Sequence, residues 1–427
     1  MAKPKLAMIP STVGGSVYSV LPSNGDGDFD FSRASAATRI NAQGLIETVA
    51  VGDNRLNYPL LDGTVQTCPH LLLEPQRTNL ITYSEDFSNA AWTKENTTVS
   101  SNSIISPNGN LNGSLITSTS ASFSDILQST SEVASSNYVL SSYAKKGSSK
   151  WFFLRLTFAT SAPYVWFNLD DGTIGTIGSG LTAKIENTGN GWYRCSISGV
   201  ASASPPASRV DIGVSNSDGS QVPIIGNSVY IYGAQLELGS YLTSYIVSNS
   251  GSATTRLAEV CDGSGNASTF NSSEGVLMAQ IGALANDGTY RLMALAKDTY
   301  NTIFIGYSPT SNQIVGVIYV GGVLQVNMAY TVTDATNFRK VAIKYALNDF
   351  ALWIDGVEVD TDNSGPVFPA ATLDEIQFDD GGGSNVFYGN TKQLQYFDSA
   401  LTDSELETLT SWMSFSDMAI DLNYTIQ

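Results

Sequence analysis

Short apolar runs separated by Gly, Ser, Asn and Asp recur through the middle of the chain. One such run is 151–158, and a second, 164–169, leads into Asp171-Gly172 and then into a further β-prone stretch. An Asx-Gly pair between two such runs is a strong signal for a β-hairpin. Comparable runs follow at 191–197, 209–214 and 229–236. Many short strands joined by turn residues predict an antiparallel sandwich or jelly roll over residues 81–250.

The same pattern returns in the C-terminal half of the chain, where it predicts a second sandwich over residues 265–412. Phe350, Leu352 and Ile354 alternate with other residues, so their side chains share one face of a strand. Asp355-Gly356 follows directly and suits a tight type I′ turn. We therefore expect a hairpin here.

One short helix is expected near the C-terminus, where Thr402 is a candidate N-cap and Glu405 completes a capping box. Residues 1–80 are rich in turn residues and are interpreted as an attachment or oligomerisation module. Residues 251–264 are interpreted as a linker, and residues 413–427 as a C-terminal extension with a strand-like pattern. The predicted fold class is all-β: two tandem antiparallel β-sandwich (jelly-roll) domains after a loop-rich N-terminal attachment module.

The composition of the chain disfavours several classes of function. Only 14% of the 427 residues are charged, and the formal net charge is −18, so we expect no nucleic-acid partner. Three widely spaced cysteines, Cys68, Cys195 and Cys261, do not indicate a disulfide framework. We find no apolar run typical of a signal peptide or a membrane helix. We therefore expect synthesis in a cytoplasm, no membrane insertion, and release on a particle or by lysis.

The inventory of catalytic groups is small, so we expect no enzyme activity. His70 is the only histidine, and no nucleophile stands near it at a motif spacing. Glu375, Gln377 and Asp379 share one strand face, as the carboxylates of some lectin-fold glycosidases do. A retaining glycosidase needs two carboxyl groups about 5–5.5 Å apart, and here the middle residue is an amide.

Several ordered motifs carry a family resemblance. Residues 28–40 (DFDFSRASAATRI) and 72–80 (LLEPQRTNL) resemble segments near the start of bacteriophage tail-fibre and head-spike structural proteins. Gly-Trp-Tyr-Arg at 191–194 and Gly-Ala-Gln-Leu-Glu at 233–237 are similar to the carbohydrate-binding-module-like jelly roll of those proteins. The unit beginning at 265 resembles a concanavalin-A-like or laminin-G-like lectin domain, through features such as Leu-Trp-Ile-Asp-Gly at 352–356.

The resemblance implies a fibre or spike on the tail or capsid surface of a virion. It also implies other virion proteins as partners, a homotrimer, and a contribution to recognition of a host surface glycan. Two alternatives remain open. The chain could be a purely structural head fibre, capsid decoration or tail connector without a receptor, or a polysaccharide depolymerase, which the incomplete carboxylate set disfavours.

A sugar site needs a flat aromatic ring beside amides or carboxylates. Six aromatic residues are candidates for such contacts, four in the first predicted sandwich and two in the second: Trp151, Tyr164, Trp166, Tyr193, Trp353 and Tyr388.

Two acidic turns are candidates for calcium, and no other cofactor is expected. Asp26 and Asp28 space oxygen ligands at every second residue, but the sequence does not continue as an EF-hand. Asp379 and Asp380 precede a run of three glycines at a predicted sandwich edge, where lectin-like domains sometimes hold calcium.

Overall fold

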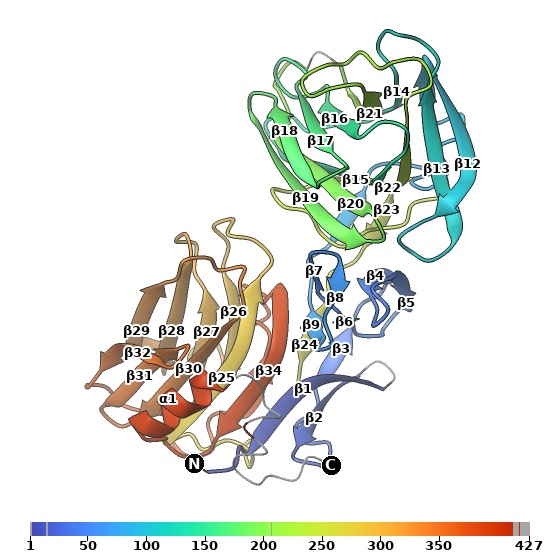
Figure 1. The fold of residues 1–427 in the computed structure, drawn as a ribbon. Coiled ribbons are helices and arrows are strands. Elements are labelled where there is room, and N and C mark those ends of the chain that lie inside the picture. Colours follow the sequence, from blue (N-terminus) through green and yellow to red (C-terminus); the bar gives the residue numbers. More distant parts are fainter. Residues whose placement is uncertain (1, 14–15, 206, 413–417, 419–427) are drawn as a thin grey trace.

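The computed structural model describes residues 2–13, 16–205, 207–412 and 418. It is built almost entirely of antiparallel strands, which form two sandwiches with N-terminal hairpins between them (Figure 1). The predicted all-β class with two sandwiches is therefore confirmed. The predicted extension, residues 413–427, lies outside the described residues apart from Met418.

The first sandwich packs two six-stranded sheets face to face. One sheet has the order β11 (Thr93–Glu95), β14 (Asp125–Ser129), β21 (Arg209–Ser215), β16 (Trp151–Leu156), β17 (Tyr164–Asn168), β18 (Thr173–Ile177). The other has the order β12 (Thr97–Ile105), β13 (Leu111–Ser118), β22 (Ser228–Leu238), β15 (Asn137–Lys146), β20 (Trp192–Val200), β19 (Leu181–Gly189). Phe152 and Leu154 from one sheet and Leu140, Ile197 and Ile231 from the other are fully buried in the core between them.

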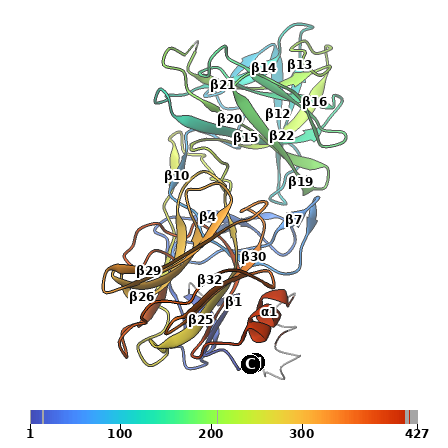
Figure 2. The same cartoon turned by 90° about the vertical axis from the view of Figure 1, so that its left-hand side faces the viewer.

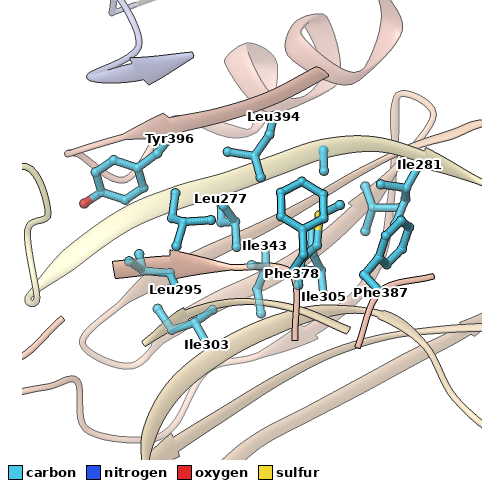
Figure 3. Close-up of a cluster of buried hydrophobic side chains, with 14 of the residues drawn as sticks. Leu277, Ile281, Leu295, Ile303, Ile305, Ile343, Phe378, Phe387, Leu394 and Tyr396 are labelled. Atoms are coloured by element: carbon cyan, nitrogen blue, oxygen red, sulfur yellow. The ribbon is translucent and has the colours of Figure 1, made fainter. Parts of the chain in front are cut away.

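The second sandwich packs a five-stranded sheet against a nine-stranded one. The smaller sheet has the order β29 (Val323–Thr331), β28 (Gln313–Val320), β27 (Asn301–Tyr307), β26 (Arg291–Asp298), β33 (Glu375–Gln377). The larger sheet contains β25 (Glu274–Ala283), β30 (Arg339–Ala346), β31 (Asp349–Ile354), β32 (Val357–Asp362) and β34 (Gly389–Phe397). Leu277, Ile343 and Leu394 of the larger sheet meet Leu295 and Ile303 of the smaller one (Figure 3).

The N-terminal segment joins the second sandwich. β1 (Leu6–Val13) pairs with β34 and with β2 (Ser16–Leu21), and β9 (His70–Leu72) pairs with β34 and with β6 (Leu56–Asn57). Residues expected to be a linker form β23 (Thr254–Arg256) and β24 (Val260–Asp262), which pair with β10 (Arg77–Asn79) and β3 (Asp30–Ser32). Two hairpins, β4–β5 (Ala37–Ile40, Ile46–Val49) and β7–β8 (Leu60–Leu61, Thr64–Val65), complete this segment. An attachment role for residues 1–80 stays a prediction.

Buried charges hold the junction between the segment and the sandwiches. The Arg55 Nη1 atom lies 2.8 Å from Glu74 Oε2, and the Arg55 Nε atom donates to Glu259 Oε1 at 2.8 Å. Glu259 Oε1 also accepts from Arg33 Nη1 at 2.8 Å, and Arg256 Nη1 lies 2.7 Å from Glu74 Oε2. All five side chains are almost fully buried, so each charge depends on its partners.

Two local predictions for the second sandwich are confirmed. Asp355 and Gly356 have φ values of 49° and 84°, as a type I′ turn requires, and they join β31 to β32. Helix α1 (Asp403–Ser411) begins with the expected capping box of Thr402 and Glu405. No helix in the described residues is long and apolar enough to cross a membrane.

Candidate functional site

Three predicted sugar-contact residues gather on the outer face of the β16–β17 sheet. The rings of Tyr164 and Trp166 stack with centroids 5.4 Å apart, and Trp151 belongs to the same cluster. The Trp166 Nε1 atom donates to the Ser220 carbonyl at 2.7 Å, and the Arg155 guanidinium lies 4.4 Å from the Tyr164 ring centre. Only 9% of Tyr164 and 6% of Trp166 is exposed, so these rings have little free face for a sugar.

An acidic pair lies on the same sheet face. Asp211 Oδ2 accepts from Arg155 at 2.9 Å, whereas neither carboxylate oxygen of Asp125 has a hydrogen-bond partner among the described residues. Burial, and then the nearby charges of Asp211 and Glu95, raise the pKa of Asp125 to about 8. Asp125 is therefore protonated at neutral pH.

The other three predicted aromatics are separate from this face and from one another. Trp353 is 6% exposed and lies in an apolar cluster with Leu406 and Leu409 of α1. Tyr388 packs against the core of the second sandwich, and Tyr193 packs against that of the first. The six candidates therefore do not form one shared surface.

Both predicted calcium turns use their carboxylates internally. Asp26 Oδ2 accepts from the Asn24 amide at 2.7 Å, and Asp28 Oδ1 accepts from the Ser19 N–H at 2.8 Å. Asp379 Oδ1 accepts from Gly381 N–H at 2.7 Å, and Asp380 accepts from two backbone N–H groups of its own loop. Among the described residues, no group of three or more His, Cys, Asp or Glu side chains could hold a metal ion.

The residues weighed for catalysis have structural partners. Glu375 Oε1 accepts from the Gly263 N–H at 2.7 Å. His70 is buried and its Nε2 lies 3.2 Å from the Asn57 amide nitrogen. Burial and the nearby positive charge of Lys392 lower the pKa of His70 to about 3, so the imidazole is neutral at physiological pH.

A groove missed by the sequence reasoning runs over the outer face of β26–β29. Its volume is about 540 Å³, a size typical of small-ligand sites. Side chains alternate along these strands, so Ile303 and Ile305 enter the core while Phe304 faces outward. On the next strand Ile318 is buried and Tyr319 faces the groove.

Two aromatic rings and an apolar floor form the centre of the groove. Phe304 and Tyr319 are partly exposed, and their rings stack with centroids 6.4 Å apart and an interplanar angle of 27°. Leu292, Val315 and Val317 form the apolar cluster on which they rest. A flat apolar platform of this kind can pack against the C–H face of a sugar ring.

Polar groups surround the aromatic pair. The Asn327 side chain is exposed and lies across from Val317 in the strand register. Within the described part of the chain, the Asn327 side-chain amide and the Tyr319 hydroxyl have no hydrogen-bond partner, so both can bond to a ligand in the groove. Asp380 and Asn385, from the glycine-rich loop, line one end. The calcium candidate Asp380 thus borders the groove as a wall residue.

Comparison with known proteins identifies no family. No protein-family model matches the chain, and no curated protein sequence matches it. Among solved structures, the chain is similar to the CBM40 of the Ruminococcus gnavus IT-sialidase, with 13% identity over 32% of this chain and 83% of that one, at a TM-score of 0.28. It is also similar to domain 4 of AbnA, a GH43 extracellular arabinanase from Geobacillus stearothermophilus, with 14% identity over 40% of this chain and 83% of that one, at a TM-score of 0.29.

Domains LG4-5 of the mouse laminin α1 chain are a third similar structure. The identity is 10%, the match covers 66% of this chain and 90% of that one, and the TM-score is 0.23. Likenesses at these scores carry no argument about ligand or origin. The functional argument therefore rests on the motifs and on the groove.

Proposed function

We propose that this chain is a non-enzymatic, glycan-binding surface protein of a bacteriophage virion, and that the groove on β26–β29 holds the glycan. The stacked, partly exposed rings of Phe304 and Tyr319 are the observation that carries the proposal. They offer an apolar platform beside the Asn327 amide, which is the combination that sugar recognition needs.

The virion assignment rests on the ordered motifs at 28–40, 72–80, 191–194 and 233–237. A homotrimer and contacts with other virion proteins are part of the same proposal, because the resemblance implies them. Repetition on a particle would let individually weak sugar contacts add through avidity. Immunogold labelling of intact virions with an antibody against this chain tests the location, and unlabelled particles would contradict it.

A glycan array probed with the purified full chain tests the binding function. We expect retention on host surface saccharides, and we expect Tyr319→Ala to weaken it at least tenfold because the variant removes half of the platform. Tyr330→Ala is the matched control. Tyr330 is an exposed tyrosine of β29, the strand that pairs with the strand of Tyr319, and it does not line the groove.

Equal loss in both variants, or no retention of the unmodified chain over a denatured sample, would contradict glycan binding at the groove. The second outcome would favour the purely structural alternative, a head fibre, capsid decoration or tail connector. Release of reducing ends from host polysaccharide would contradict the non-enzymatic part of the proposal.

A further inference from the structure

A second cavity lies where the first sandwich meets the N-terminal segment. Its volume is about 500 Å³, and β15, β19 and β20 supply one wall. The β4–β5 hairpin, residues 57–60 and residues 240–245 supply the other. In Figures 1 and 2 the β4–β5 and β7–β8 hairpins lie between the two sandwiches, below the β19 end of the first. The cavity shares no lining residue with the outer groove, so the two are separate.

Several polar side chains of β19 and β20 line the sheet wall of this cavity. Lys184 and Glu186 of β19 lie opposite Ser196 and Arg194 of β20 in the strand register. Hydroxyl and amide side chains extend the wall on both sides: Thr182, Ser198, Asn57, Asn187 and Ser240. Apolar side chains such as Ile46, Val139 and Leu242 also line the cavity, so it offers apolar contacts beside these hydrogen-bonding groups.

Four of the five charged side chains in the lining already have partners. Lys184 Nζ lies 2.7 Å from Glu186 Oε1, and Arg39 Nε lies 3.0 Å from Glu47 Oε2. The Glu74 carboxylate is paired with buried arginines at the junction. These charges cancel locally, so they do not attract an ion.

Arg194 is different. Its Nε and Nη2 atoms are buried and have no hydrogen-bond partner among the described residues, and its guanidinium packs 5.3 Å from the centre of the Tyr143 ring. These two donors are closed to solvent, so a ligand in the cavity meets the remaining, accessible part of the Arg194 side chain. A guanidinium pairs best with a planar carboxylate. The cavity thus has one uncompensated positive charge in a chain whose net charge is −18.

We propose that this cavity is a second saccharide site, specific for a sugar that carries one carboxylate, such as a uronic acid. The carboxylate pairs with Arg194, and the sugar hydroxyls bond to the Ser, Thr and Asn side chains of the wall. A ligand with several negative charges does not fit, because one guanidinium compensates only one carboxylate. The site needs no contribution from the β26–β29 groove.

Saturation-transfer NMR and titration of the full chain with D-glucuronate and D-glucose test this proposal, because the two sugars differ only in the carboxylate. We expect glucuronate to bind about ten- to a hundredfold more tightly than glucose, as a charge-assisted pair predicts. Arg194→Gln removes the preference and Arg194→Lys keeps part of it. Arg339→Gln is the control, since Arg339 is partly exposed and pairs with Asp355 elsewhere.

Thermal unfolding of each variant checks that the fold is intact. Tyr319→Ala must leave glucuronate binding unchanged, which separates this site from the proposed groove. Equal affinity for the two sugars, no binding of glucuronate by the unmodified chain, or unchanged binding by a folded Arg194→Gln variant would each overturn the proposal.

Discussion

The buried carboxyl group of Asp125 predicts an unusual pH dependence for the stability of the first sandwich. Its pKa is about 8 in the folded chain, against an ordinary value of 3.8 that applies once the chain unfolds. A carboxyl group with a raised pKa stabilises the fold fully below pH 4, and this contribution is lost as the pH rises towards 8. Each unit of difference corresponds to about 1.4 kcal/mol. We expect the free energy of unfolding of this sandwich to fall between pH 5 and pH 8.

Asp125→Asn tests the assignment, since the amide keeps the shape and cannot ionise. Denaturant unfolding at pH 5, 7 and 8 should show a smaller pH slope in the variant and a more stable protein at pH 8. Asp218→Asn changes an exposed carboxyl group of the same domain and should leave the slope unchanged. The same slope in Asp125→Asn as in the unmodified chain would mean that another group titrates.

Residue type alone does not indicate how far the predicted sugar-contact rings are exposed. Tyr164 and Trp166 have the ring chemistry of a sugar platform, yet their position beneath Arg155 and the Ser220 loop became visible only in three dimensions. Phe304 and Tyr319 stand in apolar runs that look like core strands on both faces. One feature of the sequence does indicate the groove. Both β27 and β28 have apolar residues at consecutive positions, and because successive side chains point to opposite faces of a sheet, only every second one can enter the core. The others must lie on the outer face.

Among the helices and strands, helix α1 allows a direct test of a local interaction, because a single capping box at Thr402 stabilises its first turn. The Glu405 N–H donates to Thr402 Oγ1, and Glu405 Oε2 accepts from the Thr402 N–H at 3.0 Å. Thr402→Ala should cost about 0.5–2 kcal/mol, and Thr402→Ser should cost little. Hydrogen exchange by mass spectrometry over 403–411 is the measurement, and equal exchange in both variants would contradict the role of the cap.

Turn and cap residues in the sequence predict where individual hairpins and helices form, but they do not predict which distant strands pair in a sheet. The hairpin at Asp355-Gly356 and the helix after Thr402 follow from turn and cap chemistry within a few residues. The pairing of β1 with β34 joins Leu6 to Tyr396. Nothing near residue 6 indicates that partner, because register between distant strands depends on the whole sheet. The polar sequence of residues 251–264 likewise predicts a linker, because nothing near it indicates that β23 and β24 pair with the distant strands β10 and β3.

At the scale of the whole molecule, the junction depends on Glu259. Its carboxylate accepts from Arg33, from Arg55 and from the Glu74 N–H, so it joins the N-terminal segment to the chain between the sandwiches. Glu259→Gln leaves two buried guanidinium groups with less compensation, and loss of one partner of a buried ion pair typically costs about 3–5 kcal/mol. We expect a lower unfolding midpoint and faster protease cleavage within 251–264.

Glu47→Gln is the matched control for that substitution. Glu47 pairs with Arg39 at a partly exposed position, where such a pair contributes about 0–1 kcal/mol, so the midpoint should barely move. Equal effects of the two substitutions would mean that the junction does not depend on the buried charges.

The junction and the first sandwich should also respond to acid in opposite directions. The buried arginines and the Ser244 hydrogen bonds hold the pKa of Glu74 at about 2, below its ordinary 4.5. A lowered pKa stabilises the fold above pH 4.5, and this contribution is lost as the pH falls towards 2. As the pH is lowered from 8, calorimetry should therefore first show a rise in the unfolding midpoint of the sandwich that contains Asp125. Below pH 4.5, down to pH 3, it should show a fall in the unfolding midpoint of the junction. Glu74→Gln should remove the decline and Asp125→Asn the rise. A midpoint that changes in one direction over the whole range would show that these two carboxyl groups do not control the pH response.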